Sequence, residues 1–378
     1  MVSSNRCAAG SGEFIIQQLG RMGLDVAEGL ALARKGRRVA MASRCSVHIK
    51  SDATHKLNKG ECAPEDIAYT LMVDLAARIR ALVDATTWPK RSIVVSGGLA
   101  LNDLLVEELR RLLPESEVST LPESPYLEAY GAALAASRRG QLERPLADYL
   151  VPADGRDFET LPPLSLFVGR VTRHEPEPPL PPQPGMRVLL GVDAGSTTTK
   201  AALLHLESGR LVASCYLRTH GNPLRATSLC LAEIARQVGD RPVEIAQAAV
   251  TGSGRDLVSV ALGGCLSFNE ILAHARAARQ AHPTIDTIFE IGGQDSKFVS
   301  VLGGITVDYS MNDGCSAGTG SFLEETAASD MQFRVDAIGP LALEGRAPLA
   351  FGERCAAFIN SEIRTALQAG ADRMDILA

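Results

Sequence analysis

The chain has 378 residues, of which 46% are hydrophobic and 22% are charged, the balance of a soluble globular protein with room for two or three domains. A net charge of −6 and the lack of a basic tract interleaved with aromatic residues argue against nucleic acid as the main partner. We find no signal peptide at the N-terminus and no apolar run of the roughly 18 residues that a membrane span needs, so we expect a cytoplasmic protein that binds no membrane.

In chain order, the first predicted unit spans residues 1–140. Apolar residues at helical spacing predict helices over about residues 13–34 and 64–84. Residues 92–113 then predict a strand, a glycine turn and a helix, and residues 126–137 predict a helix of small residues.

A proline-rich linker follows over residues 141–185. Its last part, HEPEPPLPPQPG at residues 174–185, holds six prolines among twelve residues, which excludes a helix or a central strand. We expect this part to form a stiff, extended arm.

The second predicted unit spans residues 186–378. Residues 186–219 predict a three-stranded antiparallel meander, and residues 287–311 predict three more short strands joined by glycine turns. Helices are expected between them over residues 224–239 and 269–282. The fold class is therefore α/β with mixed sheets.

The turn after the first strand of this unit, GVDAGSTTTK at residues 191–200, indicates phosphate binding. Small residues let the backbone close on phosphate oxygens, hydroxyl and N–H groups donate hydrogen bonds, and a carboxylate can hold Mg²⁺ or a water bound to it. An ordinary tight hairpin explains the same residues equally well. The residues assigned to this turn are Asp193, Gly195, Ser196, Thr197, Thr198 and Lys200.

Two further glycine turns strengthen this interpretation. EIGGQDSK at residues 290–297 contains Gly292, Gly293, Gln294 and Asp295, and its carboxamide and carboxylate suit the orientation of an attacking water. SIVVSGGLALN at residues 92–102 follows a strand and precedes a helix, the usual position for approach to the ribose and adenine of a nucleotide. Its assigned residues are Gly97, Gly98 and Asn102. One glycine pair is weak evidence, whereas the combination indicates a nucleotide clamp with two lobes.

Two cysteine pairs form an internal repeat. SNRCAAGSG at residues 4–12 and NDGCSAGTG at residues 312–320 share Cys-x-Ala-Gly-x-Gly, and each is followed by a second cysteine. The first pair, Cys7 and Cys45, is 38 residues apart, and the second, Cys315 and Cys355, is 40 apart. In the second copy, Gly318, Thr319 and Gly320 are expected to leave backbone N–H groups free for an anion.

The four repeated cysteines are compatible with Zn²⁺, disulfides or packing. Eight cysteines in such a chain favour metal binding or catalysis over a disulfide framework, and neither copy has the close pairs that structural zinc prefers. Each copy supplies two thiolates, half of the four that a four-iron, four-sulfur (4Fe-4S) cluster takes, which implies a cluster shared between two copies. The other cysteines are interpreted as packing residues, namely Cys62, Cys215, Cys230 and Cys265. His274 is interpreted as a helix-surface or lobe-contact residue rather than a ligand.

Together, DAGSTTTK, EIGGQDSK, NDGCSAGTG, ERCAAFINSE and VVSGGLALN resemble the motifs of the ATPase activators (component A) of 2-hydroxyacyl-CoA dehydratases and of the related ATPase subunits of benzoyl-CoA reductase. The resemblance covers nearly all of both units, and the cysteine within a glycine turn is specific because ordinary sugar kinases lack it. That family belongs to the superfamily of actin, heat-shock chaperones and sugar kinases. The resemblance therefore implies ribonuclease-H-like lobes that bind ATP and Mg²⁺.

The resemblance also implies that ATP hydrolysis drives low-potential electrons from a 4Fe-4S cluster to a 2-hydroxyacyl-CoA dehydratase or a benzoyl-CoA-reductase-like enzyme, with a ferredoxin or flavodoxin as electron donor. Family members are homodimers in which one cluster bridges two subunits through two cysteines from each. The implied ligands here are Cys7, Cys45, Cys315 and Cys355. Gln294 and Asp295 are the residues expected to carry catalysis.

The sequence departs from the family because both copies are incomplete. The first unit lacks the GVDAGSTTTK and EIGGQDSK turns, and the second stops before a glycine pair and a terminal helix. We expect the C-terminal lobe of one activator domain, followed by the N-terminal lobe and the start of the second lobe of another. The two cysteine pairs would then meet in an intramolecular pseudo-dimer, with each cysteine beside a glycine turn or at a strand end.

Four alternatives stay open. The cluster could form in a dimer of two chains, or the first unit could supply the adenosine-side lobe of one complete nucleotide site. A sugar or acyl kinase of the same superfamily would need a substrate pocket with a catalytic base but no repeated cysteines. A non-catalytic assembly module would need neither a substrate pocket nor the repeated cysteines.

Overall fold

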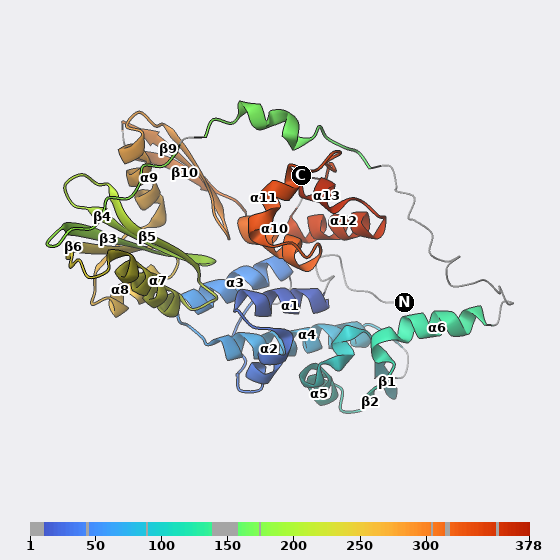
Figure 1. Cartoon of the computed structure of the whole chain (residues 1–378). Coiled ribbons are helices and arrows are strands. Elements are labelled where there is room, and N and C mark those ends of the chain that lie inside the picture. Colours follow the sequence, from blue (N-terminus) through green and yellow to red (C-terminus); the bar gives the residue numbers. More distant parts are fainter. Residues whose placement is uncertain are drawn as a thin grey trace.

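The computed structural model describes residues 11–42, 45–87, 90–137, 158–173, 175–303, 305–313, 318–352 and 355–378. The described chain forms a helical region with a small sheet, a five-stranded sheet, and a three-stranded sheet followed by a group of helices (Figure 1). None of the helices in these ranges combines the length and the apolar character that crossing a membrane requires.

The first unit is mainly helical. Its elements are α1 (Ser11–Arg21), α2 (Val26–Ala33), α3 (Ser46–Asn58), α4 (Pro64–Asp84), β1 (Ser92–Val95), η2 (Gly98–Leu101), α5 (Asp103–Leu112), β2 (Glu117–Thr120), η3 (Ser124–Tyr126) and α6 (Leu127–Ala136). α4 is the centre of this region, because its buried residues Ile67, Leu71 and Met72 pack in one core with Leu19 of α1 and Leu105 of α5. β1 and β2 pair in parallel.

The prediction of one helix over residues 13–34 is wrong, because two helices occupy this range. Gly23, between them, has a φ of +74°, which ends α1. Asp25 then begins α2 with a capping box, in which Asp25 Oδ1 accepts from the N–H of Glu28 at 2.8 Å and Glu28 Oε2 accepts from the N–H of Asp25 at 3.0 Å. The helix predicted over residues 64–84 is confirmed.

The five-stranded sheet opens the second unit. Its strands are β3 (Arg187–Ala194), β4 (Thr198–His205), β5 (Leu211–Arg218), β6 (Glu244–Thr251) and β7 (Leu266–Ser267). Their order is β5-β4-β3-β6-β7, with β5-β4-β3 antiparallel and β3-β6-β7 parallel. This confirms the predicted meander, and it is the strand order of the ribonuclease-H-like fold. α7 (Pro223–Val238) packs on β4 and β5, and α8 (Arg255–Ala261) packs on β6.

The three short strands predicted over residues 287–311 are confirmed as β8 (Thr287–Ile291), β9 (Ser296–Leu302) and β10 (Ile305–Met311), and the structure pairs them antiparallel. α9 (Glu270–Ala281) packs against β9 and β10 through Ile271, Val299 and Val301. The C-terminal helices follow as α10 (Thr319–Ser329), η7 (Val335–Ala337), α11 (Ile338–Ala342), α12 (Ala356–Gln368) and α13 (Arg373–Leu377). The mixed α/β fold class is therefore confirmed.

The described part of the linker contacts two parts of the second unit, the segment between α11 and α12 and the five-stranded sheet. Ahead of η5 (Leu164–Arg170), the N–H of Leu161 donates to the carbonyl of Pro348 at 2.7 Å. Residues 175–183 run without helix or strand, and the N–H of Leu180 donates to the carbonyl of Leu211 at 2.7 Å. Residues 175–183 of the arm thus lack the helix and strand that its prolines exclude, and Leu180 binds the arm to the edge strand β5.

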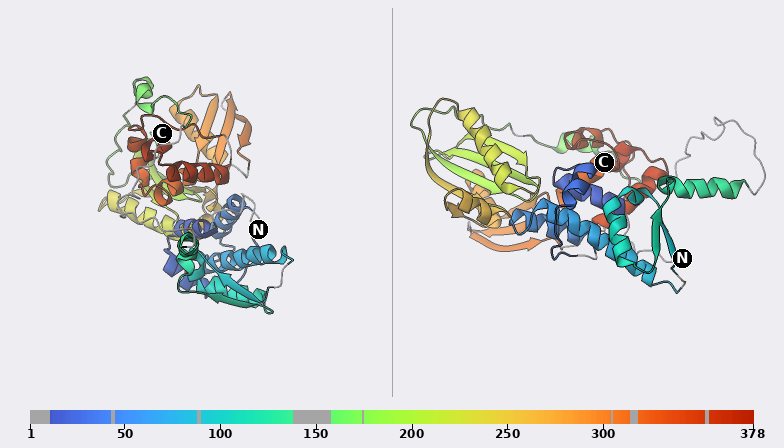
Figure 2. Two further views of the ribbon diagram at one scale, coloured as in Figure 1. Left: turned by 90° about the vertical axis from the view of Figure 1, so that its right-hand side faces the viewer. Right: turned by 90° about the horizontal axis from the view of Figure 1, so that it is seen from below.

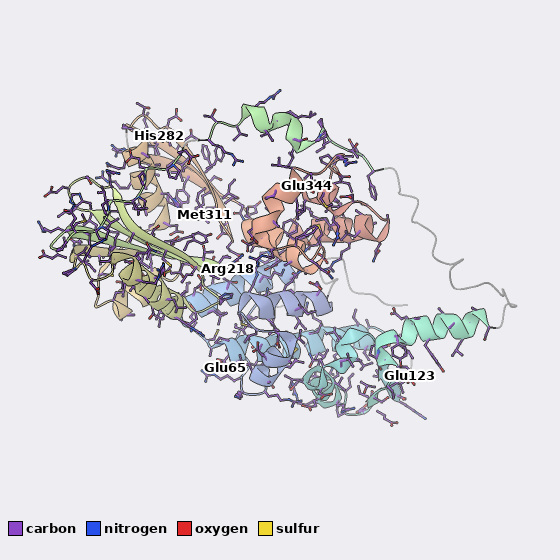
Figure 3. The ribbon with its side chains drawn as sticks, in the orientation of Figure 1. Glu65, Glu123, Arg218, His282, Met311 and Glu344 are labelled. Carbon is purple, nitrogen blue, oxygen red and sulfur yellow. The ribbon has the colours of Figure 1, made fainter. Side chains whose placement is uncertain are left out.

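The two units are in contact through α1 and α3. α3 touches α12, and Asn58 Nδ2 donates to Ser253 Oγ at 3.2 Å. A cavity of about 400 Å³ lies between α1, α3, α10 and the end of β5, where Arg218 pairs with Glu324. Figure 3 labels Arg218 at this junction. The five-stranded sheet and α6 lie at opposite ends of the molecule (Figures 1 and 2).

Candidate functional site

A cleft of about 260 Å³ lies between the turn after β3 and the turn between β8 and β9. Its lining includes all ten residues that sequence analysis assigned to these two turns: Asp193, Gly195, Ser196, Thr197, Thr198, Lys200, Gly292, Gly293, Gln294 and Asp295. The structure therefore brings together, across one cleft, two turns that are about 100 residues apart in the sequence.

Two glycines allow the close approach of the backbone here. A Cβ on Gly293 would lie 2.5 Å from Oγ1 of Thr197, so a larger residue would push the two turns apart. Gly252, directly after β6, has a φ of +92°, and a Cβ there would lie 2.4 Å from Oδ1 of Asp193. Sequence reasoning missed Gly252, although the run TGSG at residues 251–254 carries the small residues typical of such a turn.

The cleft carries charges of both signs. Lys200 Nζ pairs with Asp193 Oδ2 at 2.8 Å, and Lys297 Nζ pairs with Glu290 Oε2 at 2.8 Å. Ammonium groups bind phosphate as point charges, and carboxylates bind Mg²⁺ when phosphate oxygens and waters supply its other ligands. The second pair was not assigned from the sequence, although it flanks the predicted turn on both sides.

A buried hydroxyl fits a polar ligand in this cleft. Thr251 lines the cleft, and its Oγ1 is buried without a hydrogen-bond partner in the described part of the protein. Buried hydroxyl groups usually have a partner, so this oxygen suits a phosphate or a bound water. Together with the two charged pairs, it makes the cleft suitable for a polyphosphate with its cation.

Gln294 and Asp295 differ in their surroundings. Asp295 lines the cleft, whereas Gln294 lines both the cleft and a smaller cavity of about 30 Å³ beside α10. Gln294 is only 3% exposed, and its Oε1 accepts a hydrogen bond of 3.3 Å from Nη1 of Arg21. Arg21 belongs to the first unit and was not assigned from the sequence, where nothing links it to a residue 273 positions away.

The third glycine pair does not join the cleft. Gly97, Gly98 and Asn102 are absent from its lining, and β1, which precedes them, lies far from β3 (Figure 1). Asn102 is 6% exposed, and its Oδ1 accepts from the N–H of Leu105 at 3.1 Å as the N-cap of α5. In this structure Asn102 therefore has a structural role at the start of a helix.

Residues at the start of α10 donate backbone hydrogen bonds to the turn between β8 and β9. The N–H of Gly318 donates to the carbonyl of Gln294 at 2.6 Å, and the N–H of Gly320 donates to the carbonyl of Gly292 at 3.0 Å. These two N–H groups are therefore engaged by the protein, contrary to the expectation that they stay free for an anion. Thr319, between them, is the first residue of α10.

Cys45 and Cys355 occupy equivalent positions. They are the N-caps of α3 and α12, two helices in contact, and not strand ends as expected. The first turns of both helices and Gly318 line the same cavity of about 30 Å³. Cys7 and Cys315 lie outside the described residues. Among those that are described, no group of three or more His, Cys, Asp or Glu is arranged to hold a metal ion.

The other four cysteines pack as interpreted. Cys215 and Cys230 are buried in the core of the five-stranded sheet. The pKa of Cys230 is raised to about 12, mainly by burial and secondly by its hydrogen bond with Cys215. Cys62 and Cys265 are partly buried against the two main cores, and burial raises the pKa of Cys62. His274, on α9, is exposed and lines the cleft.

A buried charged cluster joins the two units beside this cavity. Glu325 of α10 pairs with Arg21 of α1 and with Lys50 of α3, whose Nζ lies 2.7 Å from Glu325 Oε2. The three side chains are only 15–16% exposed. Burial by itself would raise the pKa of Glu325, but Arg21 and Lys50 together hold this pKa below its ordinary value of 4.5.

This cluster leads to an expected pH dependence. A carboxyl with a lowered pKa in the folded protein contributes stability above its unfolded pKa, and that contribution is lost as pH falls through the folded value. We therefore expect the free energy of unfolding to decrease with acidification below the ordinary value of 4.5. Urea unfolding at a series of pH values measures it. Glu325→Gln should flatten this part of the profile, whereas Glu344→Gln, at an exposed position, should not. Equal profiles in the two variants would contradict this origin.

The chain is similar to several known proteins. A model of the BadF/BadG/BcrA/BcrD ATPase family matches residues 2–136 and 190–378. The (R)-2-hydroxyglutaryl-CoA dehydratase activating ATPase of Acidaminococcus fermentans is 30% identical over 189 residues, covering 50% of this chain and 71% of that protein. One of the subunits of benzoyl-CoA reductase from Thauera aromatica is 28% identical over 147 residues, covering 37% of this chain and 52% of that protein.

Among solved structures, the activator of the 2-hydroxyisocaproyl-CoA dehydratase from Clostridium difficile with bound ADPNP is similar, with 28% identity and a TM-score of 0.45. The similarity covers 50% of this chain and 69% of that one.

Proposed function

Because this chain belongs to the BadF/BadG/BcrA/BcrD ATPase family and is an ATP-hydrolysing enzyme, we propose that it activates a 2-hydroxyacyl-CoA dehydratase or a benzoyl-CoA-reductase-like enzyme. ATP hydrolysis would be coupled to delivery of a low-potential electron to that partner. The names of two relatives, a dehydratase activating ATPase and a benzoyl-CoA reductase subunit, support this choice of partner.

The observation that carries the proposal is the pair of turns that face each other across the cleft. Ser196, Thr197 and Thr198 would donate hydrogen bonds to phosphate oxygens, and Lys200 would add a positive charge. Asp193 would hold Mg²⁺ directly or through a water. Gln294 and Asp295 would orient the attacking water, since catalysis of phosphoryl transfer depends on positioning and on charge stabilisation.

The cysteines supply a donor set that fits a 4Fe-4S cluster. Cys45 and Cys355 cap two helices that are in contact with each other. The repeat adds Cys7 and Cys315, which completes four thiolates. When bound, such a cluster would supply one-electron chemistry, with a ferredoxin or flavodoxin as the proposed electron donor. The contact of α3 with α12 supports a pseudo-dimer within one chain.

The proposal is tested by measuring ATP turnover, iron content and colour on one preparation of anaerobically purified chain. We expect phosphate release from Mg-ATP, about four irons per chain and a brown colour. The same protein should then activate a 2-hydroxyacyl-CoA dehydratase only when ATP and a reductant are present. Nucleotide turnover by iron-free protein would instead favour a kinase of the same superfamily. Neither turnover nor iron would favour an assembly module.

A further inference from the structure

Arg21 belongs to the first unit and contacts the turn between β8 and β9 of the second unit. It is the last residue of α1, and its guanidinium contacts three groups of the second unit. Nη1 donates to Gln294 Oε1 at 3.3 Å, Nη2 donates to Ser321 Oγ at 2.8 Å, and Nε pairs with Glu325. The side chain of Arg21 is 16% exposed, so water competes little for these bonds.

The hydrogen bond to Gln294 determines how its carboxamide is oriented. A guanidinium has only donors, so it binds the oxygen end of the amide and leaves the NH₂ end directed elsewhere. Gln294 is 3% exposed, and its backbone carbonyl is held by the N–H of Gly318 at 2.6 Å. Arg21 is therefore the group that selects one of the two amide orientations at a turn that lines the cleft.

We infer that Arg21 is a positioning residue for ATP hydrolysis. It acts by holding the Gln294 carboxamide in the orientation in which this group orients the attacking water. This inference rests on the proposed function, because it assigns Gln294 a part in orienting water. It adds that hydrolysis at the cleft of the second unit requires a side chain of the first unit. A small misplacement of an orienting group lowers a turnover rate by about tenfold to hundredfold.

If Arg21 supplied only a positive charge, a lysine at this position would serve equally well. Glu325 already has a second cationic partner in Lys50, at 2.7 Å. A lysine at position 21 would keep the positive charge beside Glu325. It would not keep the planar fork that serves Glu325, Ser321 and Gln294 at once, because one ammonium is a single point of donation. Arg21→Lys therefore keeps the positive charge beside Glu325 and removes the donor geometry that orients Gln294.

The experiment compares Arg21→Lys with Arg34→Lys in the whole chain. Arg34 is the matched control, since it also belongs to the first unit and pairs with Glu107 at a surface where its side chain is 49% exposed. We expect Arg21→Lys to lower kcat about tenfold or more, while the Kd for a non-hydrolysable ATP analogue changes less than about threefold. Thermal unfolding of both variants checks that each is fully folded at the assay temperature, since Arg21→Lys also loses buried hydrogen bonds. Wild-type kcat in Arg21→Lys overturns the inference.

A double-mutant cycle tests whether Arg21 acts through Gln294. In a Gln294→Ala background, Arg21→Lys should cause no further loss of kcat, because the group that it positions is gone. The same fold loss in both backgrounds would overturn the inference and leave Arg21 with a structural role only.

Hydrogen exchange keeps the inference separate from the proposed function. If the wild-type chain shows no ATP turnover, the proposed function fails, and exchange of the Gln294 side-chain NH₂ protons, followed by NMR with the analogue bound, decides on Arg21. Faster exchange in Arg21→Lys than in Arg34→Lys supports positioning of this carboxamide by Arg21, and equal exchange overturns it.

Discussion

Serine in place of Cys45 or Cys355 is expected to abolish iron binding, lowering the iron content from about four atoms per chain to less than about one. Both cysteines cap helices whose first turns line one cavity, so each would supply one of four ligands at the contact between the units. A serine hydroxyl is a poor substitute, because a 4Fe-4S cluster is held by four cysteine thiolates and a serine hydroxyl stays protonated at neutral pH. Iron analysis and visible absorption of anaerobically purified protein measure the loss.

Cys265→Ser and Cys62→Ser are the matched controls, since both positions are partly buried against apolar cores away from this cavity. They should keep the full iron content. Iron retained by Cys45→Ser would exclude Cys45 as a ligand. The mass in solution decides the arrangement: four irons in a monomer supports the pseudo-dimer, and four irons only in a dimer rejects it.

Asp295→Ala is expected to lower kcat for ATP hydrolysis by about a hundredfold or more, as for the loss of a group that positions water or a metal ion. Asp295 lines the cleft at the turn between β8 and β9 and belongs to none of the apolar cores, so the fold should persist. Phosphate release under saturating Mg-ATP measures kcat, and thermal unfolding checks the fold.

Asp308→Ala is a suitable comparison, because Asp308 lies exposed on β10 of the same sheet and does not line the cleft. It should keep wild-type turnover. If Asp295→Ala hydrolyses ATP at the wild-type rate, Asp295 has no part in the mechanism, and the orientation of water would depend on Gln294.

The elements that could be predicted are those with a local signal. The two meanders follow from alternation and glycine turns, and α4 from a long apolar period that begins at a proline. α3 was not predicted, because its sequence SVHIKSDATHKLN is mostly polar and its buried face is completed by other helices. β6 was missed for a related reason, because its pairing with β3 is parallel and joins distant segments.

The residues of the candidate site likewise divide into those with a local sequence signal and those without one. The two turns that line the cleft could be found because each carries its glycines and polar residues within ten positions of sequence. Arg21 could not, since its position beside Gln294 depends on how the first unit packs on the second. The glycine pair at Gly97 and Gly98 has a suitable local sequence, yet it lies outside the cleft lining, because adjacency to the two turns of the cleft is a property of tertiary structure.

The charged cluster of Arg21, Lys50 and Glu325 shows what a tandem arrangement allows. By the cysteine repeat, Glu325 corresponds to Gln17 and Lys50 corresponds to Asn360, so equivalent positions carry different residues. In a homodimer each substitution enters both subunits, and every contact is made twice about the two-fold axis. Covalent fusion removes that restriction, and one half can specialise as the acidic side of the contact while the other specialises as the basic side. The two halves can thus evolve as a heterodimer would.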